Sequence, residues 1–220
     1  MPGRKGTRVK DPHKKGLYLE YFTIAYNALE AGASIAFGAL AGSIALIGFG
    51  LDSVVESLSG LVLIWRLVRH GRISREREER VERNAMRFVA VTFFILAAYV
   101  LYESVSKLVH QEVPEVSVPG IIIALVSLIV MPVLAWMKKD TGERIGSGAL
   151  VADSKETLVC AFLSLALLLG LGSNYLFGFW QADPIAGIFI VLFLLYEGHE
   201  VWEESGEGEE EESHPDVADS

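Results

Sequence analysis

Cysteine occurs once in this chain, at position 160, so no disulfide can form within it and the redox compartment cannot be inferred. Histidine is missing from the middle of every long apolar stretch. The five histidines stand at the ends of such stretches or between them: His13, His70, His110, His199 and His214. We expect none of them to be a site ligand.

Charged residues are nearly absent from six long apolar stretches, and gather instead in the first 15 residues, in 66–87, in 138–144 and in the last 18 residues. Just over half of the chain, 51%, is hydrophobic, which is unusual for a soluble domain. Each stretch has about the 20 residues that an α-helix needs to cross the hydrocarbon core. The sequence therefore predicts an all-α integral membrane protein with six transmembrane helices: Leu17–Ala39, Ser43–Val68, Ala85–His110, Pro119–Met137, Ala149–Gly172 and Asp183–Trp202.

Lysine and arginine are distributed unevenly between the two sets of loops. Six precede the first span, eight lie in 66–87 and three in 138–144, whereas the alternate loops are almost bare. By the positive-inside rule, both termini are predicted to face the cytoplasm, in a multi-pass protein of the cell membrane. The basic start leads straight into the first span, so no cleavable signal peptide is expected.

These features divide the chain into three parts. Residues 1–16 are expected to form a basic cytoplasmic tail, and residues 17–202 a six-helix transmembrane domain. Residues 203–220 are acidic and have few apolar residues to bury, so we expect a disordered cytoplasmic tail.

Two of the spans each carry a pair of metal-ligand residue types four positions apart. Asp52 and Glu56 lie in the second span, and Glu156 and Cys160 lie in the fifth. Residues four apart share one face of an α-helix. A carboxylate inside the hydrocarbon costs a few kcal/mol or more, so each is a candidate functional residue. The second span offers no basic partner for its acids.

The two pairs are expected at matching depths in the membrane. The second and fifth spans run in opposite directions, and each residue advances about 1.5 Å along the helix. Asp52 then comes level with Cys160, and Glu56 level with Glu156. Two antiparallel helices can thus offer four ligands at one height, which predicts a buried cation site. Cys160 taken alone would be a small core residue.

Three further polar residues stand near this site. Asp153 is about 60° from Glu156 on the same helical face; it is an accessory or proton-pathway candidate, or else the partner of Lys138, Lys139 or Arg144. Glu30, with Asn27 one turn before it in the first span, is another buried acid. It serves as a proton relay, a point of ligand access or a hydrogen-bonded structural acid.

The spans together resemble the transmembrane domain of the cation diffusion facilitator (cation efflux) family. The similarity covers about residues 17–202, and it lies in Gly42–Leu46 followed by Asp52-x-x-x-Glu56, in Ala152-Asp153 before Glu156-x-x-x-Cys160, in Asp183–Ala186 and in Tyr102–Ser104 with Leu108. The resemblance implies a homodimeric exporter of divalent transition metals, usually zinc, driven by protons moving the other way.

The sequence departs from that family's pattern in three respects. Glu156 and Cys160 stand where the family's fifth helix usually has histidine and aspartate, and an acidic tail of about 18 residues follows the sixth span in place of the usual cytoplasmic domain. A thiol with carboxylates suits Zn²⁺ or Cd²⁺, with Fe²⁺, Co²⁺ or Mn²⁺ as alternatives, and argues against Mg²⁺ or Ca²⁺. No permanently bound cofactor is expected.

Charge suggests how such a site would work. Three carboxylates and a thiol in a low-dielectric cavity cannot all be ionised without a counter-cation. Metal binding would release protons from its ligands, so a site open alternately to each side would be an antiporter. The partners expected are the lipid bilayer, a divalent metal ion, protons and a second copy of the chain, with no nucleic acid.

Three alternatives remain at this stage. The chain could be a non-transporting membrane scaffold or accessory subunit, whose acids face amide or hydroxyl partners rather than one another. An ion channel would more typically present a ring of charges than two helical pairs. An enzyme is not predicted, because Cys160 has no histidine or amine base near it in the sequence.

Overall fold

The computed structural model describes residues 12–69 and 75–213, apart from some side chains within these ranges. Over these residues the chain forms six α-helices and no strand. Each contains a segment long and apolar enough to cross a membrane, so the predicted all-α fold with six spans is confirmed. The helices are α1 (Pro12–Ala41), α2 (Ile44–Arg69), α3 (Arg75–His110), α4 (Val118–Ile145), α5 (Gly148–Phe177) and α6 (Ala182–Ser213).

Three helices extend well beyond the apolar spans that the sequence suggested. α3 begins at Arg75, α4 runs on to Ile145 and α6 to Ser213. Glutamate, lysine and arginine favour helix, so a helix need not end where the hydrocarbon ends. Residues 203–213, expected to be disordered, are therefore helical in the structure. The tails at 1–11 and 214–220 lie outside the described residues.

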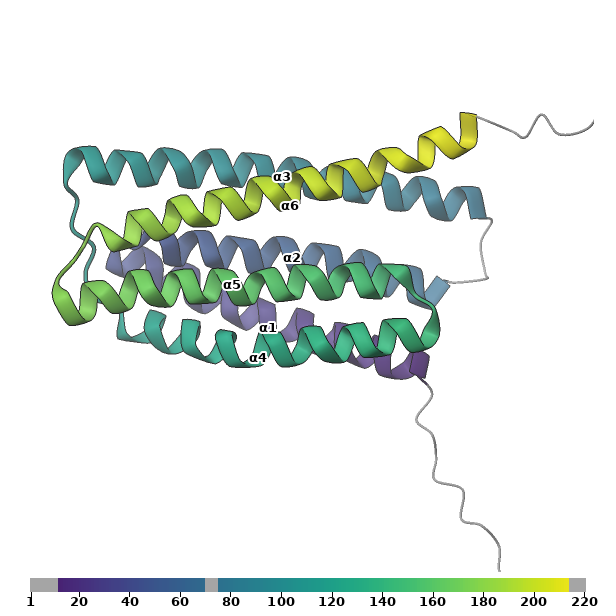
Figure 1. Ribbon diagram of the computed structural model, residues 1–220, viewed down its shortest axis with the longest axis horizontal. Coiled ribbons are helices and arrows are strands. Elements are labelled where there is room, and N and C mark those ends of the chain that lie inside the picture. Colours follow the sequence, from purple (N-terminus) through teal and green to yellow (C-terminus); the bar gives the residue numbers. More distant parts are fainter. Residues whose placement is uncertain (1–11, 70–74, 214–220) are drawn as a thin grey trace, which may run out of the picture.

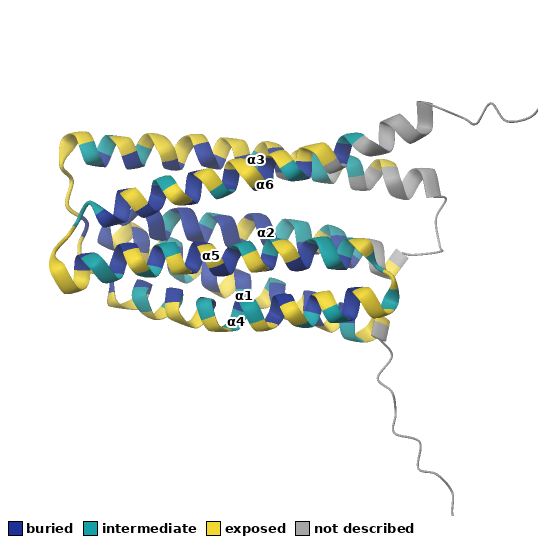
Figure 2. Ribbon diagram, in the orientation of Figure 1, coloured by how far each residue is buried: buried dark blue, intermediate teal, exposed yellow. Residues whose placement is uncertain are grey.

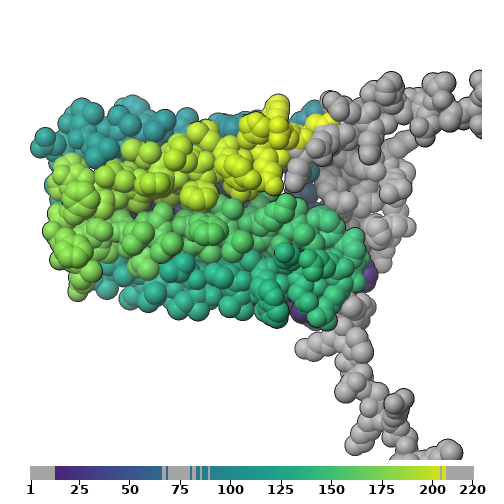
Figure 3. All heavy atoms as spheres, in the orientation of Figure 1, coloured from purple at the N-terminus to yellow at the C-terminus, as the bar shows by residue number. Residues whose placement is uncertain are grey.

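The helices run alternately up and down, so the start of α1 and the end of α6 lie at the same end of the bundle (Figure 1). α2 is central, because it packs against α1, α3, α5 and α6. The most extensive pairings are α3 with α6, α4 with α5 and α1 with α2. Figure 3 shows α4, α5 and α6 side by side on one face of the molecule.

The helix faces that point into the bundle are buried, and those that point outward are exposed (Figure 2). The interior contains Phe49, Val100, Leu167 and Ile190, each 0% exposed. Large apolar residues on every helix instead lie on the outer surface, for example Ile129 and Leu169. An apolar surface of this extent is typical of a protein surrounded by lipid.

At the end opposite the termini, α2 begins with a polar clamp. Gly42 turns the chain with a φ of 63°, a conformation that glycine adopts without strain. The hydroxyl of Ser43 then accepts a bond from the Leu46 N–H at 3.1 Å and donates one to Asp183 of α6. Asp183 also accepts from the Ile44 N–H at 3.1 Å. One carboxylate thereby caps α2 and joins it to α6.

We predict that Asp183→Ala lowers the thermal stability of the protein in detergent. The Ser43 hydroxyl and the Ile44 N–H would lose a charged acceptor in a buried position, at a cost of about 1–3 kcal/mol. The measurement is the melting temperature by circular dichroism. Glu112→Ala, which removes an exposed acid from the loop at the same end, is the matched control and should melt like the wild type. Equal melting temperatures for Asp183→Ala and the wild type would contradict the claim that Asp183 stabilises the contact between α2 and α6.

Candidate metal site

α1 presents a continuous polar stripe to the interior of the bundle. Glu20, Thr23, Asn27, Glu30 and Ser34 are spaced three or four residues apart, and none is more than 5% exposed. This spacing keeps all five on one face of the helix. Glu20 was overlooked in the sequence, although the same periodicity, extended two turns back from Asn27, would have found it.

The α1 stripe reaches α2 beside the first predicted ligand pair. Gly50 makes the close approach possible, because a Cβ there would lie 2.9 Å from Ser34 Cβ and 3.1 Å from the Ala31 carbonyl oxygen. Ser53 donates a hydrogen bond of 2.8 Å to Glu30 Oε2, while Glu30 Oε1 has no hydrogen-bond partner. Asn27 approaches Glu56, yet its side-chain atoms make no hydrogen bond of good geometry.

On α2, the two acids of the predicted pair are both buried, with Asp52 7% and Glu56 5% exposed. Glu56 Oε1 accepts a hydrogen bond of 2.9 Å from Thr157 Oγ1 on α5. Glu56 Oε2 is buried and has no hydrogen-bond partner among the described residues. Thr157 directly follows Glu156 in α5, so this bond places Glu56 close to the depth of Glu156.

Glu56 is the common neighbour of the other three predicted ligands. It interacts electrostatically with Asp52 one turn away on α2, and with Glu156 and Cys160 of α5. Cys160 is buried, with 1% exposure, and Glu156 is only partly buried. These interactions connect Glu56 with one acid of its own helix and with both predicted ligands of α5.

These neighbours do not form a closed coordination shell. Within the described residues, no three histidine, cysteine, aspartate or glutamate side chains are grouped so that they could hold a metal ion. The arrangement is a cluster of buried acids and one thiol whose side chains are directed to separate contacts, such as Glu56 to Thr157.

α6 adds a carboxylate that sequence reasoning missed. Glu197 is 7% exposed and interacts electrostatically with both Asp52 and Glu156. In the sequence it stands among Tyr196, His199 and Glu200, a polar run that resembles the point where a helix leaves the membrane. A third helix therefore contributes an acid to the cluster.

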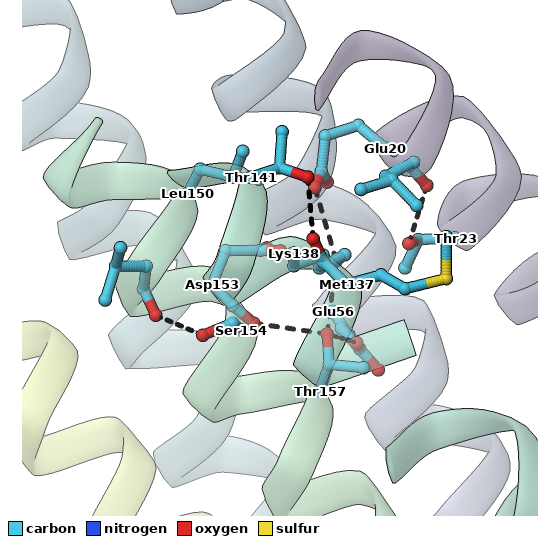
Figure 4. A network of polar contacts seen from close by, with 12 residues as sticks. Glu20, Thr23, Glu56, Met137, Lys138, Thr141, Leu150, Asp153, Ser154 and Thr157 are labelled. Atoms are coloured by element: carbon cyan, nitrogen blue, oxygen red, sulfur yellow. Dashed lines mark hydrogen bonds and ion pairs between the residues drawn. The ribbon is translucent and has the colours of Figure 1, made fainter. Parts of the chain in front are cut away.

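Asp153 contacts one of the three basic residues that the sequence offered as its partners. It accepts a hydrogen bond from Lys138 Nζ of α4 (Figure 4). The other cations proposed for it lie elsewhere: Lys139 is exposed, and Arg144 pairs with Asp140 at 2.8 Å. Lys155 is exposed as expected, and it lies 3.9 Å from Glu200 of α6.

Lys138 itself was assigned to a cytoplasmic loop, and this assignment is wrong. It lies inside α4 and is 0% exposed. Besides Asp153, its ammonium lies 3.4 Å from Glu20 Oε1 of α1 and donates a hydrogen bond of 3.1 Å to Thr157 Oγ1. A buried lysine is tolerated when carboxylates compensate its charge, and here α1 and α5 each supply one.

Comparison with known proteins agrees with this architecture. The chain is 31% identical over 173 residues to a probable cation efflux system protein of Mycobacterium tuberculosis, covering 76% of this chain and 51% of that protein. It is 26% identical over 199 residues to Transmembrane protein 163 of Xenopus laevis, covering 87% of this chain and 69% of that protein.

A third relative is named a cadmium, cobalt and zinc/H(+)-K(+) antiporter, from Bacillus velezensis. It is 24% identical over 199 residues, which cover 88% of this chain and 62% of that protein. The chain thus spans about half to two thirds of the length of these relatives. The family model of the cation efflux transmembrane domain matches residues 21–207. The chain therefore belongs to the cation efflux family, as a multi-pass integral membrane protein of a family that transports metal cations.

Proposed function

We propose that this protein exports a divalent transition metal, with Zn²⁺ as the first candidate, in exchange for protons. The metal would bind between α2 and α5 to Asp52, Glu56, Glu156 and Cys160, at a site open alternately to each side of the membrane. The Bacillus relative named as a metal and proton antiporter supports this combination of ions. The distribution of lysine and arginine favours cytoplasmic termini, and the family resemblance favours a homodimer.

The observation that carries this proposal is the state of Glu56. It is buried, its Oε2 atom makes no hydrogen bond of good geometry among the described residues, and it interacts electrostatically with the three other potential ligands. A buried acceptor without a partner costs about 1–3 kcal/mol. A divalent cation would remove that cost and would also offset the repulsion between the acids.

Binding would require the ligands to turn toward one another, since no metal-holding group is present among the described side chains. Glu56 would leave Thr157, and the α2 and α5 pairs would close on the ion. The charge of the ion would drive protons from the ligands. When the site opens to the other side, protons returning to some of the ligands would release the metal.

The scaffold alternative has one observation in its favour. Glu30 accepts from the Ser53 hydroxyl and Glu56 from the Thr157 hydroxyl, which are the partners that structural acids would have. Each of these carboxylates nevertheless keeps one buried oxygen without a hydrogen bond of good geometry among the described residues. A metal ion bound to Glu56 would satisfy one of these two oxygens.

We predict that Asp52→Asn and Glu156→Gln each abolish metal transport while the protein stays folded. Both substitutions preserve the shape of the side chain and remove a negative ligand, and less buried charge should not impair membrane insertion. The measurement is the rate of Zn²⁺ uptake into proteoliposomes while a proton gradient drives protons in the opposite direction.

Glu203→Gln is the matched control, because Glu203 is an exposed acid on α6 that pairs with His199. It should transport like the wild type. Wild-type flux in both Asp52→Asn and Glu156→Gln would reject the ligand assignment and favour the scaffold.

We predict that Cys160 determines which metal is preferred more than whether transport occurs. A thiolate favours soft or borderline cations and a carboxylate favours hard ones. Cys160→Asp should therefore shift preference toward Mn²⁺, and Cys160→Ala should weaken Cd²⁺ and Zn²⁺ binding most. The measurement is competitive metal binding at fixed pH. If the Cd²⁺-to-Mn²⁺ affinity ratio is the same in both variants as in the wild type, Cys160 is a packing residue.

A further inference from the structure

The Lys138 ammonium is the one cation with 0% exposure among the described residues, and it makes three polar contacts. It pairs with Glu20 of α1 and with Asp153 of α5, and it donates to the Thr157 hydroxyl. Figure 4 shows the side chains of Glu20 from α1 and of Asp153 and Thr157 from α5 around Lys138, with Glu56 beyond Thr157.

Two carboxylates would suffice to compensate one buried ammonium, so the third contact needs its own explanation. Thr157 accepts from Lys138 at 3.1 Å, and its hydroxyl lies 2.9 Å from Glu56 Oε1 and 3.1 Å from the Asp153 carbonyl oxygen. A hydroxyl that accepts from an ammonium still has its own proton to donate. Two consecutive hydrogen bonds therefore connect the Lys138 charge to Glu56, and the two groups also attract each other directly.

We propose that Lys138 is the resident counter-cation of Glu56. It stabilises the Glu56 carboxylate through Thr157 when the site holds no metal, and Glu56 leaves Thr157 when a divalent ion arrives. Lys138 is a positioning residue, not a ligand. This role rests on the metal site proposed above.

One consequence is that Lys138 limits how tightly the site holds metal. A metal ion must displace Glu56 from its hydrogen bond with Thr157, and it must also bind near the fixed positive charge of Lys138. Weaker binding speeds release, which a transporter requires. Without Lys138, the site should bind metal more tightly and release it more slowly.

The first test replaces the charge. Lys138→Met keeps most of the side-chain volume, and removing one buried unit charge near a divalent ion should lower the Zn²⁺ dissociation constant by about tenfold or more. Zn²⁺ flux should fall because release slows. Lys139→Met, the exposed neighbour on α4, is the control and should change neither quantity. Binding is measured by isothermal titration of the purified full chain with Zn²⁺.

The second test keeps the Lys138 charge and removes the hydroxyl that connects it to Glu56. Thr157→Val leaves the Lys138 pairs with Glu20 and Asp153 in place but removes the hydroxyl, so the dissociation constant should fall several-fold. Thr141→Val is the matched control, since Thr141 is also buried but bonds only to the Met137 carbonyl oxygen at 2.7 Å. In the double variant the two effects should not add, because both act through one contact.

Unchanged or weaker Zn²⁺ binding by folded Lys138→Met overturns the proposal. If that variant does not fold, Thr157→Val decides: binding equal to that of Thr141→Val, or weaker, also overturns it. Asp52→Asn distinguishes a failure of the proposed metal site from a failure of the counter-cation role. If it binds Zn²⁺ like the wild type, the metal site itself is misplaced; if it loses binding while Lys138→Met matches the wild type, only the counter-cation role fails.

Discussion

The burial of carboxylates inside an apolar bundle is the constraint on which the rest of this structure depends. Glu20, Glu30, Asp52, Glu56 and Asp153 are all at most 7% exposed, in a protein whose outer surface is apolar. Each needs a proton, a hydrogen-bond donor or a cation nearby, because an isolated charge in this environment is too costly. The structure provides Ser53 for Glu30, Thr157 for Glu56 and Lys138 for Asp153 and Glu20.

Sequence alone could predict the number of spans and could single out the α2 and α5 pairs as candidate ligands, because both are local patterns. The apolar runs give the membrane spans but not the helix ends, and a four-residue spacing fixes a common face. Lys138 could not be placed in this way. It directly follows an apolar run and precedes Lys139, a pattern typical of a helix leaving the membrane, and only the tertiary structure brings Glu20 and Asp153 to its depth. Glu197 was missed for the same reason at the end of the sixth span.

The acids of the candidate site differ in how completely they are satisfied. Asp183, outside the site, accepts from a hydroxyl and a backbone N–H, and thereby fixes α2 against α6. Glu56 accepts from one hydroxyl and keeps a second oxygen without a hydrogen-bond partner among the described residues. Fully bonded acids stabilise one arrangement of helices, whereas a partly bonded acid leaves room for a second arrangement in which another group replaces its partner. Glu56 can therefore exchange its partner more readily than Asp183 can.

The position of Lys138 also indicates which helix contact would respond to a metal. Its ion pairs join α1, α4 and α5 and involve neither α3 nor α6. Thr157 connects that group to Glu56, on the central helix α2. A metal that draws Glu56 away from Thr157 therefore loosens the contact between α2 and α5 while the Lys138 ion pairs stay intact. On the other side, Glu197 of α6 interacts with Asp52 and Glu156, so the charge brought by the metal would act on α6 as well. Metal binding at this site would thus change the contacts of α2 with α5 and with α6.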